Sequence, residues 1–386
     1  MSLAAGRVHS GLTILGCFGA GSLYGWSGYM PAVRAQFAVS NALASMVFSL
    51  ALVSFTVGVL LGPYFLKRMS SRYRLALLAV LAVLALSGAG ASAGFGTFVA
   101  SYGVCFGLIC GALYNHALAT ASFTASATLL IPISVASFGL GGAVFGPVQF
   151  WLNTSGWSLW SHAPVLVCFV FVALLAFFAG SSFTSETVEQ TPAKRMILPD
   201  KTIVVLGVIF AAGSSSGLIV IGFASQILPR GADGLGLTSL AIFLSAIGNT
   251  LGRLSSALSA GWFGPARAIA GAMVATLITL GSLIFAATPI LVVGLLFFVA
   301  FGYGQLAASM PLLVKSQVEA STFSASFGWV FVGWGVAGLI GPWSAGWLMD
   351  STGTLKASLL ICIVLAALSF WLVLGFSKTD RPQEDS

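Results

Sequence analysis

Charge is the scarcest property of this sequence. Only 6% of the 386 residues are Asp, Glu, Lys or Arg, whereas 58% are hydrophobic and the mean hydropathy is +1.03. A soluble domain carries roughly a quarter charged residues, so a water-exposed surface is excluded for most of this chain. The sequence therefore predicts an integral membrane protein, whose main solvent is hydrocarbon.

Several kinds of functional group are also missing. Every acidic residue lies in a loop, at a helix end or in the tail, and the cysteines are scattered through apolar segments without ligand-like pairing. The net charge of +7 comes from basic loops rather than from a nucleic-acid surface. No nucleotide-binding motif, Ser/His/acid set or metal-ligand cluster is present, so we expect no enzyme, no cofactor, no metal and no nucleic-acid partner.

Twelve apolar runs are long enough to cross roughly 30 Å of hydrocarbon. They lie at residues 9–33, 42–66, 73–94, 97–120, 127–150, 162–183, 202–226, 237–262, 266–287, 289–313, 323–349 and 356–377. The polar stretch TSETVEQTPAKRMILPDK divides them six and six. We predict an all-α membrane fold with the following parts: an N-terminal six-helix bundle (1–183), a cytoplasmic linker (184–201), a C-terminal six-helix bundle (202–378) and a cytoplasmic tail (379–386).

Two patterns refine this topology. Twelve of the sixteen Lys and Arg residues fall on one side of the predicted spans, which places both termini in the cytoplasm of a cell (inner) membrane protein. The first run is too long for a signal peptide and is expected to remain as a helix. Gly103, Gly107 and Gly111 form a ridge of small residues on the fourth span, which predicts close helix packing.

One basic residue interrupts an apolar run. Arg253 lies in AIFLSAIGNTLGRLSSALSAGWFG (241–264), about nine residues and roughly 14 Å from the nearer end, a long reach for snorkelling. It is either a structural pin that bonds neighbouring carbonyls or the counter-charge for an anionic substrate. The second interpretation is favoured because small and polar residues share its helix face: Ala246, Asn249, Thr250, Ser256, Ala257 and Ala260. A guanidinium binds a carboxylate through two parallel hydrogen bonds.

Polar residues in other spans are further candidate substrate contacts. They are Tyr24 and Tyr29 in the first span, Tyr114 and Asn115 in the fourth, and Tyr303 in the tenth. For each of them an interhelical hydrogen bond is an equally open interpretation. His116 is either a proton carrier or a neutral histidine at the cytoplasmic mouth.

Four segments carry a resemblance to a known family: YGWSGYMPAV (24–33), ASFGLGGAVFGP (136–147), GNTLGR (248–253) and GWGVAGLIGP (333–342). In their order and helix placement they resemble the major facilitator superfamily, and within it the monocarboxylate-transporter-like and oxalate/formate-antiporter-like group. The segments GPVQFWLNTSG (146–156) and GPWSAGWLMDSTG (341–353) recur six helices apart, as a parallel six-helix repeat requires. One departure is GPYFLKRMSSRYR (62–74), which lacks the aspartate usual in that loop.

The resemblance implies roles for three residues. Arg253 matches the arginine that binds the substrate carboxylate, and Asn249 matches an asparagine of oxalate/formate-like members, where proton-coupled animal members have aspartate. Trp334 stands at about the position of a lysine in the eleventh helix of oxalate/formate-like carriers. This chain therefore keeps one fixed positive charge, which favours a monocarboxylate over oxalate.

We therefore expect a monomeric secondary carrier that moves a small monocarboxylate or similar organic anion by alternating access. Its partners would be the anion, the lipid bilayer and, in one version, a proton. Proton symport and anion exchange both remain open, because the spans contain no carboxylate. The alternatives are an efflux carrier for amphipathic organic compounds and a non-transporting membrane sensor or assembly factor.

Overall fold

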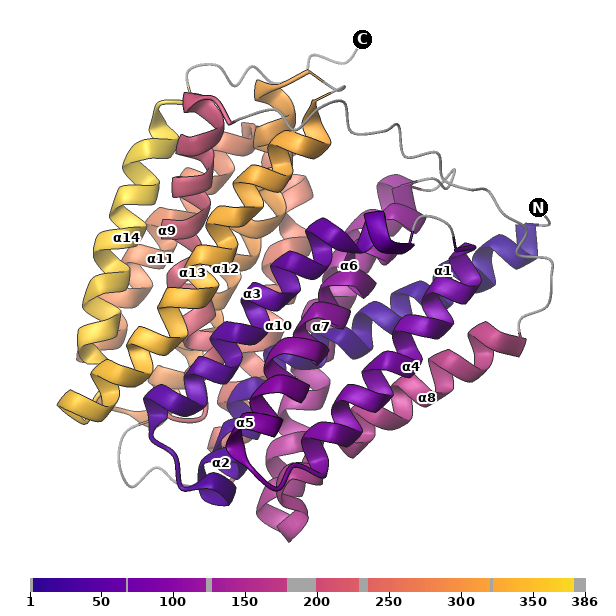
Figure 1. Ribbon diagram of the computed structural model, residues 1–386. Helices are drawn as coiled ribbons and strands as arrows, with labels where there is room; N and C mark the ends of the chain where they lie inside the picture. The colour runs from indigo at the N-terminus through magenta and orange to yellow at the C-terminus, as the bar shows by residue number, and fades with distance from the viewer. Residues whose placement is uncertain are drawn as a thin grey trace. The chain divides into compact units, whose positions relative to one another are not determined.

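The computed structural model describes residues 3–66, 69–122, 127–178, 199–228, 235–319 and 322–377, and all regular elements there are helical (Figure 1). The chain divides into two compact units. Unit 1 contains helices α1 to α8, except for the first five residues of α3, Asn41–Ser45, which belong with α9 to α14 in unit 2. Most of the predicted linker, 184–198, lies outside the described residues.

Unit 1 covers the six N-terminal predicted spans. Its elements are α1 (Leu3–Ala20), the 3-10 turn η1 (Gly21–Gly25), α2 (Trp26–Phe37), α3 (Asn41–Leu66), α4 (Ser71–Gly90), α5 (Phe95–Phe98), the π-helical segment η2 (Val99–Phe106), α6 (Gly107–Ser122), α7 (Ala127–Leu152), the short segments η3 (Asn153–Trp157) and η4 (Ser158–His162), and α8 (Ala163–Phe178). The first span is thus not one continuous α-helix, because η1 separates α1 from α2.

Unit 2 contains one continuous helix for each of the other six predicted spans. These are α9 (Lys201–Phe223), α10 (Leu235–Phe263), α11 (Pro265–Phe285), α12 (Pro289–Gln317), α13 (Phe323–Thr352) and α14 (Lys356–Leu374). Gly264 separates α10 from α11 at a φ of 85°, and Pro265 begins the next helix. Proline suits this first position because it has no N–H to leave unpaired. The chain can therefore reverse within one residue.

The glycine ridge of the fourth span packs as predicted. A β-carbon at Gly107 would meet the carbonyl oxygen of Ala51, and one at Gly111 would meet that of Phe55. Both partners lie on α3, so the backbones of α6 and α3 touch along the ridge. Lipid offers no hydrophobic drive for helix association, and such close contact between backbones replaces it.

The helices have the length and composition that a membrane requires. Among the described residues, nine stretches are long and apolar enough to cross a bilayer, and one of them, Ile133–Phe178, runs through α7, η3, η4 and α8. Their outward faces expose large apolar side chains, such as Phe285 (86%) and Val364 (68%). An exposed apolar surface of this kind is stable in hydrocarbon rather than in water. The predicted all-α membrane fold is confirmed.

Asp350, near the end of α13, caps the first turn of α3 within unit 2. Its Oδ1 accepts hydrogen bonds from the backbone N–H (3.0 Å) and the side-chain amide (2.7 Å) of Asn41, and its Oδ2 accepts one from the backbone N–H of Ala42 (2.8 Å). A carboxylate suits this place because the first N–H groups of a helix lack intrahelical partners and carry partial positive charge.

Candidate functional site

Arg253 lies on α10, ten residues before the helix ends at Phe263, and only 7% of it is exposed. Its Nε donates a hydrogen bond of 3.0 Å to Oδ1 of Asn249, one turn earlier, which is fully buried. Since Nε–H requires an acceptor, the amide oxygen of Asn249 faces the guanidinium and its Nδ2 faces away. That buried Nδ2 finds no hydrogen-bond acceptor among the described residues.

The glycines of GNTLGR bring α12 against this part of α10. A β-carbon at Gly248 or Gly252 would meet a carbonyl oxygen of α12, and one at Gly304 would meet the carbonyl oxygen of Asn249. The two backbones therefore touch on both sides of Asn249 and beside Arg253. The motif GNTLGR accordingly supplies the polar pair of Asn249 and Arg253. Its glycines also let α12 approach closely and fix the position of this pair.

Tyr303 and Trp334 form a second polar pair in the same unit. Trp334 Nε1 on α13 donates a 2.7 Å hydrogen bond to the hydroxyl oxygen of Tyr303, and both side chains are buried. The ring of Tyr303 occupies the space that a side chain at Gly217 of α9 would take. Since Tyr303 directly precedes Gly304, this pair is attached to the backbone that touches Asn249.

The hydroxyl groups near Arg253 are used within their own helix. Thr250 Oγ1 donates to the carbonyl of Ala246 (2.9 Å), and Ser256 Oγ donates to the carbonyl of Arg253 itself (2.7 Å). The small polar stripe predicted on α10 is therefore polar mainly through Asn249 and Arg253. Such back-bonding is the usual state of a hydroxyl in an apolar helix.

Three other buried polar side chains of unit 2 lie on α12 and α9. Gln305 on α12 accepts a hydrogen bond from Ser255 Oγ (3.0 Å) and donates one to Ser259 Oγ, so it links α12 to α10. On α9, the Oγ atoms of Ser214 and Ser216 are buried and have no hydrogen-bond partner in the described part of the chain. Gln305 is thus a structural link, whereas the serines are polar atoms without an assigned partner.

In unit 1, Tyr24 and Tyr114 pack against the same ring. The ring centroids of Tyr24 and Phe138 are 4.9 Å apart, and those of Tyr114 and Phe138 are 5.5 Å apart. Phe55 lies 5.5 Å from Tyr114 and completes the group. Asn115, the next residue on α6, is half-buried. Two of the candidates in unit 1 therefore share an aromatic group, to which η1, α3, α6 and α7 contribute.

Tyr29 belongs to a different cluster. Its hydroxyl donates to the carbonyl of Leu159 (2.7 Å) and lies 3.0 Å from Nδ1 of His162, with both side chains fully buried. A hydroxyl has one proton, so the oxygen of Tyr29 must accept a hydrogen bond from Nδ1–H of His162. His162 was not among the residues predicted from the sequence, although a histidine at the start of an apolar run was a visible signal.

His116, the candidate proton carrier, lies near the end of α6 and is buried. Its Nε2 is 3.4 Å from Ser71 Oγ at the start of α4. A separation of 3.4 Å is long for a hydrogen bond between nitrogen and oxygen. The contact therefore places the histidine beside α4 without fixing its tautomer.

Comparison with protein-family models and with curated protein sequences finds no match. The fold, by contrast, is similar to many solved structures. An inward-open structure of the xylose transporter XylE from E. coli has a TM-score of 0.77 at 15% identity, with 95% of each chain covered. A structure of a point mutant of the nucleoside transporter NupG has a TM-score of 0.73 at 14% identity, covering 97% of this chain and 100% of its own.

A further structure of XylE, described as a major facilitator superfamily proton:xylose symporter bound to 6-bromo-6-deoxy-D-glucose, has a TM-score of 0.73 at 15% identity and covers 98% of this chain and 97% of its own. Identity at this level carries information about the fold alone. The chain therefore has the fold of the major facilitator transporters.

Proposed function

We propose that this protein is a secondary carrier that moves a small monocarboxylate or similar organic anion by alternating access. The observation that carries the proposal is the buried pair on α10. Arg253 brings a permanent positive charge into the apolar helix, and Asn249 holds its Nε while keeping a buried Nδ2 donor without an acceptor among the described residues. A ligand that offers acceptor oxygens and negative charge complements both groups.

The energetics of the pair favour an anionic ligand. A buried donor without a partner costs about 1–3 kcal/mol, and hydrogen bonds to charged groups contribute about 1.5–3 kcal/mol each. A carboxylate has two oxygens with roughly four acceptor positions, so one ligand can accept from the guanidinium and from the amide together. A neutral ligand oxygen could accept from both donors, but it would bring no negative charge to the guanidinium.

The charge of the site limits how many carboxylates the substrate can carry. Arg253 is the one basic residue that lies away from the ends of the predicted spans, and these spans contain no carboxylate. By the resemblance to oxalate/formate-like carriers, their second cation would stand at about Trp334, whose Nε1 bonds to Tyr303. One cation compensates one carboxylate. A monocarboxylate thus leaves no second negative charge in the apolar interior, where an unpaired charge is costly.

The test is uptake of radiolabelled solutes into proteoliposomes, with and without a pH gradient. The panel contains lactate, pyruvate, formate, oxalate and longer acids, together with xylose, nucleosides and neutral amphiphiles as rival cargoes. We expect a monocarboxylate to be transported best. Stimulation by an inward proton gradient indicates symport, and stimulation by internal anion indicates exchange.

Arg253→Gln should abolish this uptake. Arg267→Gln is the matched control, because Arg267 on α11 is exposed and donates only a long hydrogen bond (3.4 Å) to the carbonyl of Ser377 within the described part of the chain. Uptake of the best carboxylate that survives in Arg253→Gln would contradict the proposal. Transport of neutral amphiphiles alone would favour an efflux carrier instead.

A further inference from the structure

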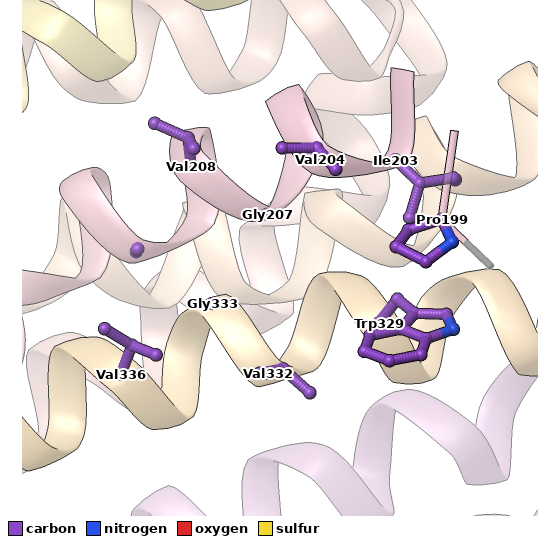
Figure 2. A pocket seen from close by; sticks show the side chains of 10 residues that line it. Pro199, Ile203, Val204, Gly207, Val208, Trp329, Val332, Gly333 and Val336 are labelled. Atoms are coloured by element: carbon purple, nitrogen blue, oxygen red, sulfur yellow. The ribbon is translucent and has the colours of Figure 1, made fainter. Parts of the chain in front are cut away.

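An apolar groove runs along unit 2 between α9 and α13 (Figure 2). It has a volume of about 260 Å³. Its lining contains no charged side chain and consists of Pro199, Ile203, Val204, Gly207, Val208, Ala211, Trp329, Val332, Gly333 and Val336. None of the residues argued above to bind substrate contributes to it. The groove is therefore a separate feature of the molecule.

Two glycines explain why the groove forms. A β-carbon at Gly333 would meet the carbonyl oxygen of Gly207, so α9 and α13 touch at their backbones there. Figure 2 shows Val204 and Val208 on one side of this contact and Val332 on the other. Each of these valines is more than a third exposed. The two glycines thus form the floor of the groove, where no side chain stands. The valines form its walls and remain exposed.

The groove begins where a membrane interface is expected. Pro199 and Trp329 lie side by side at one end (Figure 2), and Lys201, the exposed first residue of α9, follows two residues later. Tryptophan and lysine are the residues that sit at the boundary between hydrocarbon and headgroups. The ten helical steps from Lys201 to Ala211 rise about 15 Å, which is half of a hydrocarbon core of roughly 30 Å. The groove therefore has the length of one leaflet.

The chemistry of the lining limits what can occupy it. Water needs two to four polar partners, and an all-apolar lining offers almost none, so hydrocarbon is the compatible filling. At the interface end, the carboxylate of Asp200 accepts a 2.8 Å hydrogen bond from the N–H of Ile203 and is directed to its own helix. Since Asp200 already compensates the positive end of α9, the exposed ammonium group of Lys201 is the group suited to a phosphate.

We propose that the α9–α13 groove is a binding site for an anionic phospholipid, with one acyl chain along the valine walls and the phosphate at Lys201. The lipid belongs to the leaflet at the N-terminal end of α9, which the distribution of Lys and Arg predicts to be cytoplasmic. This leaflet carries the anionic lipids that attract basic residues near the membrane surface. The site is independent of the proposed substrate.

Fluorescence quenching by brominated lipids tests this site. The protein is reconstituted in phosphatidylcholine vesicles with increasing fractions of brominated phosphatidylglycerol or of brominated phosphatidylcholine. Subtracting the emission of Trp329→Phe from that of the wild type isolates Trp329. We expect Trp329 to be quenched at a roughly fivefold lower fraction of the anionic lipid, which is the preference that one lysine near a membrane surface supplies.

Two variants separate the phosphate from the acyl chain. Lys201→Gln should remove the preference for phosphatidylglycerol while Trp329 remains accessible to both lipids. Ala211→Phe, which fills the inner end of the groove, should weaken quenching by both, whereas Leu360→Phe on the exposed face of α14 should leave it unchanged. Equal quenching by the two lipids in the wild type, or a preference that persists in Lys201→Gln, would show a general lipid shell and overturn the proposal.

Discussion

Replacing Asn249 by aspartate tests the candidate site most informatively, because it changes the charge and keeps the shape of the side chain. The new carboxylate can still accept from Nε of Arg253, as the amide oxygen does at 3.0 Å. It loses the Nδ2 donor, however, and adds a negative charge beside the place proposed for the substrate. Arg253 would then be neutralised from within the protein, and a substrate anion would meet repulsion.

The expected effect is large. Two like charges about 4 Å apart interact by about 4 kcal/mol at the effective dielectric constant of about 20 that reproduces measured values in proteins. This penalty corresponds to about a thousandfold weaker binding. Loss of a hydrogen bond to the substrate anion adds about 1.5–3 kcal/mol. Anion transport by Asn249→Asp should therefore be undetectable at neutral pH.

Acidification should partly restore it. A protonated carboxyl is neutral and offers one O–H donor, so the variant then approaches asparagine in charge and in donor capacity. Uptake of the best carboxylate into proteoliposomes, measured from neutral pH downward, should rise in Asn249→Asp relative to the wild type. Equal transport by both proteins at neutral pH would refute the placement of the anion beside Asn249.

Three further predictions concern packing and buried polar groups. Gly304→Val should lower the melting temperature strongly because its β-carbon meets the carbonyl of Asn249, whereas Gly294→Val on the same helix, where nothing lies within 4 Å, should not. Asp350→Ala should lower stability by about 1–3 kcal/mol through loss of the cap on α3; an unchanged melting curve argues against that cap. Tyr29→Phe should lower stability by a similar amount, because the buried carbonyl of Leu159 loses its hydrogen-bond donor. Thermal denaturation in detergent measures the stability of all these variants.

Hydropathy was sufficient to predict the helical membrane fold, because spans of this length must satisfy their backbone hydrogen bonds internally. The ridge of Gly107 and Gly111 was also readable, since spacing by four residues places small side chains on one helix face. The 3-10 turn Gly21–Gly25 was not predicted. Residues in a 3-10 turn and in an α-helix can be equally hydrophobic, so hydropathy does not show where the first span is interrupted.

The candidate site was predictable only in part. The charge of Arg253 stood out in an apolar run, and helical periodicity placed Asn249 one turn away. The bond between Trp334 and Tyr303 joins two helices across 31 positions of the chain, and no local pattern reveals such a pair. The same is true of His162, whose partner Tyr29 lies 133 positions away. The hydroxyls of Thr250 and Ser256 looked available in sequence, yet each is bonded within its own helix.

The central claim is that Arg253 binds the substrate anion, and calorimetric titration of the purified protein with its best-transported carboxylate tests it directly. Two parallel hydrogen bonds to a charged ligand, at about 1.5–3 kcal/mol each, correspond to at least about a hundredfold in Kd. We predict that Arg253→Gln loses the binding heat while Arg267→Gln retains the wild-type Kd. An unchanged Kd in Arg253→Gln would contradict the account.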